Sequence, residues 1–71
     1  MPEYGKYFRR CRLAAGIKQT TAAKLLGVAQ SAISQYENDK HEPTLDIVVR
    51  MTEVYGCTLD DLLGETDVRS R

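Results

Sequence analysis

The sequence predicts an all-α fold: a compact bundle of five short helices without strands. Apolar residues recur at intervals of three and four residues, which is the spacing of one helical face. Glycine follows four of these periodic segments, at the position where many helices end in a left-handed residue. Because the segments are separated by short loops, we expect consecutive helices to pack against one another in one domain.

The five helices are predicted at residues 4–15, 19–26, 30–37, 45–55 and 59–63. On the first of them, Tyr4, Phe8 and Cys11 share one face. The third is short and mostly polar, and Ile33 and Tyr36 are the two positions that we expect to be buried. Most of the surface of that helix is therefore available to a partner.

The fourth and fifth helices have clear start signals. Pro43 prevents the preceding loop from continuing a helix, and Thr44 and Thr58 are suitable N-cap residues. The expected core positions of the fourth helix are Leu45, Val48, Met51 and Tyr55. Residues 1–64 then form the domain, and residues 65–71 are expected to be a short, mobile tail.

The most informative pattern spans residues 19–36. A small residue, Ala23, permits two helices to cross closely, and Gly27 permits a sharp bend between them. The second helix then turns four polar side chains to solvent: Gln30, Ser31, Ser34 and Gln35. Such side chains on an exposed helix after a bend suit base edges in the major groove of DNA. The pattern indicates a helix-turn-helix and a binding function, and an ordinary solvated helix face is the alternative.

The charge distribution supports the same interpretation. The net charge of the chain is zero, but residues 1–40 hold seven basic and three acidic residues, a net charge of +4. Residues 41–71 hold three basic and seven acidic residues, a net charge of −4. The basic half contains the helix at residues 30–37 that is expected to contact bases, and the acidic half is expected to face away from phosphates or toward a partner.

Several classes of function are not expected from this composition. No apolar run approaches the roughly 20 residues that cross a bilayer, and the start lacks a signal-peptide pattern, so we expect a cytoplasmic protein. Cys11 and Cys57 read as buried apolar residues, with a disulfide as the alternative. His41 stands alone, so neither a metal, a cofactor nor a small-molecule ligand is expected. No group of residues suggests an enzyme.

Residues 16–19, 23–28, 33–38, 43–45 and 59–63 read GIKQ, AKLLGV, ISQYEN, PTL and LDDLL. On these stretches the chain resembles the Cro and phage-repressor type of helix-turn-helix protein, often called the Xre family. The resemblance covers about residues 4–63. It implies the lambda-repressor-like five-helix fold, double-stranded DNA as partner, and a transcriptional regulator, expected to be a repressor. It also implies a homodimer on a two-fold symmetric operator.

The resemblance further implies roles for individual residues. Base contacts fall on Gln30, Ser31 and Gln35, with Ser34 beside them, and phosphate contacts fall on Lys18, Gln19, Asn38 and Lys40. Gln19 also braces the amide of Gln30. Lys18 and Ala29 occupy positions where the family usually carries polar helix caps. Asp39 stands where glycine is common, and aspartate tolerates the left-handed conformation.

Two further roles follow from the same resemblance. Arg12 and Glu37 match a charge pair that ties the first helix to the end of the third. Leu59 and Leu62 are the expected self-association surface, unless these leucines only close the core. The acidic second half also leaves open another class of function, a protein-interaction module such as an antitoxin or antirepressor with the same fold.

Overall fold

The computed structural model describes residues 3–65. Within this range the chain forms five helices and no strand: α1 (Gly5–Ala14), α2 (Gln19–Leu26), α3 (Gln30–Glu37), α4 (Leu45–Tyr55) and α5 (Leu59–Leu62). The all-α prediction is confirmed, and each predicted boundary lies within one residue of the observed one. The predicted tail, residues 65–71, lies outside the described residues except for Glu65. None of the helices in the described range is long and apolar enough to span a membrane.

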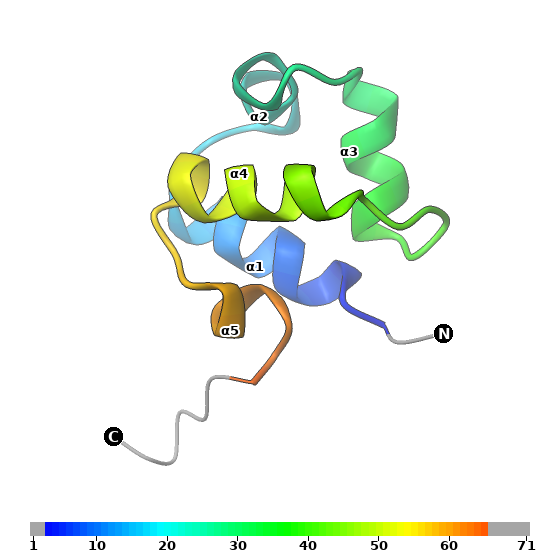
Figure 1. Cartoon of the computed structure of the whole chain (residues 1–71). Helices are drawn as coiled ribbons and strands as arrows, with labels where there is room; N and C mark the ends of the chain where they lie inside the picture. Colours follow the sequence, from blue (N-terminus) through cyan, green and yellow to red (C-terminus); the bar gives the residue numbers. More distant parts are fainter. Residues whose placement is uncertain (1–2, 66–71) are drawn as a thin grey trace.

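The helices surround one core. In Figure 1, α4 crosses the molecule in front of α1, with α2 and α3 on one side and α5 on the other. The buried apolar residues come from all five helices: Phe8, Cys11, Ala22, Ala23, Leu26, Ile33, Val48, Met51, Tyr55 and Leu62. Every helix therefore contributes to a shared interior, as the sequence periodicity predicted.

Two predicted core positions differ from the structure. Leu45 is 72% exposed, so its prediction as a core residue is wrong. It is the first residue of α4, and it lines two surface grooves, where no other helix of the described part covers it. Tyr36 is only half-buried. The residue of α3 that is buried together with Ile33 is Glu37, four positions further along the same helical face.

The helix starts follow the predicted capping chemistry. The Thr44 hydroxyl accepts a hydrogen bond from the backbone N–H of Ile47 at 3.4 Å. Thr58 and Asp61 form a reciprocal capping box at the start of α5. Lys18 and Ala29, which replace the usual polar caps, provide no side-chain cap.

Asp39, for which the sequence predicted only a backbone conformation, lies at the start of α1. Asp39 adopts φ +59° after the end of α3, as predicted. Its carboxylate also accepts a hydrogen bond from the backbone N–H of Gly5 at 2.9 Å. A Cβ at position 5 would lie 2.7 Å from the carbonyl oxygen of Tyr36 and closer still to that of Glu37. Glycine is required at position 5 because the backbones of α1 and α3 approach so closely.

We predict that Gly5→Ala destabilises the protein. The new methyl group meets rigid backbone, so α1 must move away from α3, at a cost of about 1–3 kcal/mol in the free energy of unfolding. Urea unfolding followed by circular dichroism measures this change. Arg9→Ala, an exposed change on the same helix, is the control and should stay within about 0.5 kcal/mol. Equal stability of both variants would contradict the close approach.

The hydroxyl of Tyr55 is buried without a hydrogen-bond partner among residues 3–65. The ring closes the core between α1 and α4, with 6% of the residue exposed. Burial raises the pKa of Tyr55 to about 12, because the ionised phenolate would lose its hydration. An unfolded tyrosine titrates near pH 10, so folding favours the neutral phenol.

The pH dependence of stability follows from this shift. The contribution of Tyr55 is fully present below about pH 10 and is lost as the pH rises toward 12. We predict that Tyr55→Phe is neutral or stabilising at pH 7, because it removes an unpaired polar group. We also predict that this variant loses less stability than the unmodified chain between pH 10 and 12. Urea titrations at a series of pH values test both statements, and identical alkaline profiles would refute the second.

Candidate nucleic-acid interface

Helices α2 and α3 meet through the predicted glycine bend. Gly27 adopts φ +73°, and the next backbone N–H, that of Val28, donates to the carbonyl oxygen of Ala23 at 3.0 Å. Ala23 is 5% exposed, and Ile33, on the inner face of α3, is 1% exposed. The bend is therefore closed by backbone hydrogen bonds, and α3 is anchored by one large side chain.

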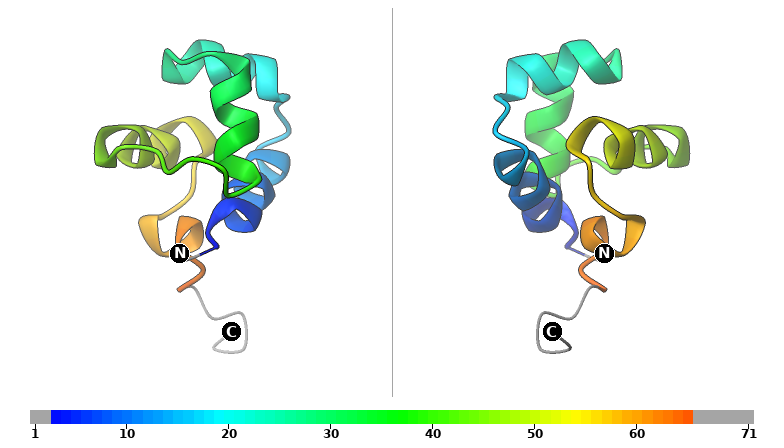
Figure 2. Two further views of the ribbon diagram at one scale, coloured as in Figure 1. Left: turned by 90° about the vertical axis from the view of Figure 1, so that its right-hand side faces the viewer. Right: turned by 90° about the vertical axis from the view of Figure 1, so that its left-hand side faces the viewer.

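The outer face of α3 carries the side chains that were predicted to read bases. Gln30, Ser31 and Gln35 are exposed, and Ser34 is half-buried. In the left view of Figure 2, α3 stands at the front of the molecule, with no other helix of the described part covering it. The structure thus places all four predicted residues on or beside one accessible helix face.

The position of the Gln30 amide is determined by a chain of hydrogen bonds that begins inside the protein. The Glu37 carboxylate accepts from the amide nitrogen of Gln19 at 3.1 Å. The amide oxygen of Gln19 then accepts from the amide nitrogen of Gln30 at 2.8 Å. The predicted bracing of Gln30 by Gln19 is confirmed, and Glu37, which was predicted only as part of the ion pair, also belongs to this chain.

This chain leaves a defined pair of groups on Gln30. An ionised carboxylate can only accept, so Glu37 requires the NH₂ side of the Gln19 amide. The amide oxygen of Gln19 is therefore the group that faces Gln30, and Gln30 must donate an N–H group to it. The amide oxygen of Gln30 and its second N–H then remain for another molecule. One acceptor beside one donor is complementary to the N6 and N7 groups of adenine.

The predicted ion pair between α1 and α3 is present and buried. Arg12 Nε donates to Glu37 Oε2 at 2.6 Å, and Arg12 Nη2 donates to Oε1 at 3.0 Å. Arg12 Nη1 donates to the carbonyl oxygen of Ile17 at 2.9 Å, just before α2. The hydrogen bonds to Glu37 raise the pKa of Arg12 above its ordinary value, so the guanidinium stays charged.

The predicted phosphate-binding residues surround this face. Lys18 and Lys40 are exposed at the start of α2 and beyond the end of α3. Asn38 lies at the C-terminal end of α3, and its amide nitrogen donates to the carbonyl oxygen of Ser34 at 2.8 Å. These side chains, with Gln19, bracket the exposed face of α3 at both ends.

Comparison with known proteins identifies the family. Residues 8–62, more than half of the chain, match the helix-turn-helix family. The chain belongs to the helix-turn-helix family. This result confirms the family resemblance of the sequence.

Two curated relatives of this helix-turn-helix chain are regulators. It is 31% identical over 67 residues to the HTH-type transcriptional regulator ImmR of Bacillus subtilis (strain 168), covering 94% of this chain and 53% of ImmR. It is 35% identical over 63 residues to the HTH-type transcriptional regulator PuuR of Escherichia coli (strain K12), covering 89% of this chain and 34% of PuuR. The chain thus spans about half of the first relative and a third of the second.

Solved structures share the fold. The P22 c2 repressor, in complex with a synthetic operator, superimposes with a TM-score of 0.81 at 29% identity, covering 93% of this chain and all of the other. The restriction-modification controller protein C.AhdI of Aeromonas hydrophila has a TM-score of 0.78 at 23% identity, covering 86% of this chain and 92% of the other, and supports the fold alone. The predicted lambda-repressor-like architecture is confirmed.

One part of the predicted self-association surface is wrong. Leu62 is fully buried in the core of its own chain, because it is the inward-facing residue of the short α5, so it cannot contact a second copy. Leu59 is 42% exposed. It lines an apolar groove with Leu45, Pro43 and Leu63, which the prediction of the two leucines did not include.

We predict that Arg12→Ala lowers the free energy of unfolding by about 3–5 kcal/mol, because it leaves the buried Glu37 carboxylate without its partner. Thermal and urea unfolding measure the loss. The double variant Arg12→Met with Glu37→Leu is the control, since it removes both charges and should cost less than Arg12→Ala. Unchanged thermal unfolding of Arg12→Ala would count against a structural role for the pair.

Proposed function

We propose that this helix-turn-helix chain is a sequence-specific transcriptional regulator, a repressor, that binds double-stranded DNA and reads the major groove with α3. The observation that carries the proposal is the hydrogen-bond chain from Glu37 through Gln19 to Gln30. It holds an exposed amide in one orientation before any partner arrives. The regulator names of ImmR and PuuR, and the operator bound to the P22 c2 repressor, support the same function.

In this proposal Gln30 reads an adenine. Its free oxygen accepts from N6, and its free N–H donates to N7. Ser31 and Gln35 make further contacts to base edges from the same face, with Ser34 beside them. Because the amide of Gln30 is already oriented by Gln19, little conformational freedom is lost when it binds.

Phosphate contacts position the domain on the duplex. Lys18, Gln19, Asn38 and Lys40 lie around the outer face of α3, and the start of α2 adds backbone N–H groups and a favourable dipole. Lys18 carries a positive charge where a capping residue is usual, and contact with a phosphate would offset the loss of the cap. Binding of this kind weakens as salt rises.

A domain of this size neutralises few phosphates, so the functional unit is a homodimer on two half-sites about one helical turn apart. The apolar groove that contains Leu59 and Leu45 supports this part of the proposal, because it is an exposed apolar surface on the side of α5. We further propose that the protein acts in the cytoplasm, without a cofactor and without catalysis.

Selection of bound DNA from a random pool tests the proposal. The expected result is a two-fold symmetric consensus with adenine at one position of each half-site, and binding that weakens steeply between low and high salt. Binding that is indifferent to sequence and salt would refute it. Stable co-purification of a protein partner, with no retention on DNA, would favour the interaction-module alternative instead.

We predict that Gln30→Ala lowers affinity for the selected operator by about 1–3 kcal/mol and relaxes the preference at one base pair. Lys40→Ala should weaken binding to all sequences and reduce the salt slope by about one. Gel shifts at several salt concentrations measure both effects. Arg9→Ala removes one positive charge from α1 and is the matched control. If Arg9→Ala lowers affinity as much as Lys40→Ala, the assignment of Lys40 to a phosphate is wrong.

A further inference from the structure

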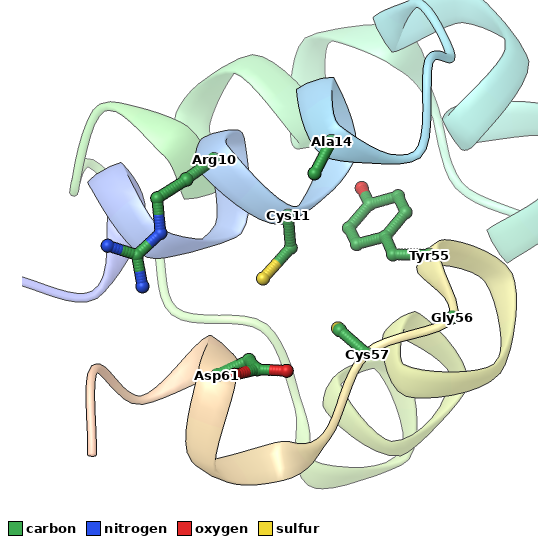
Figure 3. Close-up of a pocket in the computed structure, with 7 residues that line it drawn as sticks. All are labelled: Arg10, Cys11, Ala14, Tyr55, Gly56, Cys57 and Asp61. Atoms are coloured by element: carbon green, nitrogen blue, oxygen red, sulfur yellow. The ribbon is translucent and has the colours of Figure 1, made fainter. Parts of the chain in front are cut away.

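Cys11 and Cys57 line the same surface pocket, although 46 positions separate them in the sequence. The pocket has a volume of about 410 Å³ and lies between α1 and the link that joins α4 to α5. Both cysteines are free, and Figure 3 shows both side chains entering the pocket from opposite sides. The two thiols are near enough for each to shift the pKa of the other.

We propose that Cys11 and Cys57 form a redox-sensitive thiol pair, which a low-molecular-weight disulfide converts into an intramolecular disulfide. Cys57 is half-buried and is the thiol that the oxidant reaches first, whereas Cys11 is only 6% exposed. The two thiols thus have different roles: one is accessible, and the other resolves the first product. The proposal concerns the pocket beside α5 and rests on no DNA contact.

The reaction is a pair of thiol–disulfide exchanges. The Cys57 thiolate attacks one sulfur of the oxidant, a mixed disulfide forms, and one oxidant thiolate leaves and takes up the proton. The Cys11 thiolate then attacks the Cys57 sulfur, the Cys11–Cys57 bond forms, and the second oxidant thiolate leaves. Two protein thiols are oxidised, and the S–S bond of the oxidant is reduced to two thiols.

The surroundings of the pair determine how readily it reacts. Burial raises the pKa of both thiols, that of Cys57 to about 12, and the nearby Asp61 carboxylate raises both further. Thiolate is therefore scarce at neutral pH, and oxidation is slow. A pair of this kind responds to sustained oxidising conditions and not to a brief pulse.

The new bond would join α1 covalently to the residue before the cap of α5. Cys11 precedes Arg12 on α1, and Cys57 precedes Thr58, the cap of α5. Oxidation would fasten α5, and with it Leu59, to α1. It leaves α2 and the outer face of α3 unchanged, because neither helix lines the pocket. Oxidation is therefore expected to stabilise the domain without covering the outer face of α3.

Equilibrium titration of the full chain with reduced and oxidised glutathione tests the proposal. Alkylation and mass spectrometry measure the fraction with an intramolecular disulfide. In the folded chain, the effective concentration of the two thiols toward each other should exceed that of the same chain in urea by at least about 30-fold. The midpoint temperature of thermal unfolding should be about 10 °C or more higher for the oxidised chain than for the reduced chain. Cys57→Ser and Cys11→Ser should each abolish both effects.

Three results would overturn the proposal. The first is an effective concentration in the folded chain no higher than in urea. The second is a product that consists of glutathione adducts or of linked chains at equilibrium. The third is an oxidised chain that unfolds at the same temperature as the reduced one. Because none of these measurements uses DNA, they are independent of whether the proposed operator binding is correct.

Discussion

The buried ion pair between Arg12 and Glu37 is the interaction on which the arrangement of the helices depends. Removing two charges from water is costly, and the cost is met only when every polar group finds a partner. Here Arg12 donates to both oxygens of Glu37 and to the carbonyl of Ile17. One side chain thereby connects α1, the end of α3 and Ile17, two residues before α2. If α3 moved along its axis, a buried charge would lose its partner.

The same carboxylate links the interior to the surface. Glu37 also accepts from Gln19, and Gln19 accepts from Gln30. The buried charge of Glu37 therefore determines the orientation of the exposed Gln30 amide through Gln19. Because an ionised carboxylate has no donor, the direction of every hydrogen bond in the chain is determined from its inner end. Stability and recognition are coupled through Glu37, and a change at this residue would reach both.

Features that depend on residues close together in the sequence were predicted well, and features that depend on residues far apart in the sequence were not. Helix boundaries depend on local periodicity, glycines and caps, and they were predicted within one residue. Burial was less predictable, because periodicity shows which residues share a face but not where other helices cover it. Leu45 and Leu62 were wrongly assigned for this reason. The contact between Gly5 and Asp39 joins residues 34 positions apart and has no local signal. The Arg12–Glu37 pair was predicted only through the family resemblance.

A small domain has reason to keep such a pair although apolar residues could fill the same space. Buried ion pairs contribute little net stability compared with well-packed apolar side chains. An apolar pair, however, could neither satisfy the carbonyl oxygen of Ile17 nor offer an acceptor to Gln19. The first loss would leave a polar group unpaired at the start of α2, and the second would release the amide that orients Gln30. The chain thus retains charges in its core because they determine one position of α3 and one orientation of its first side chain.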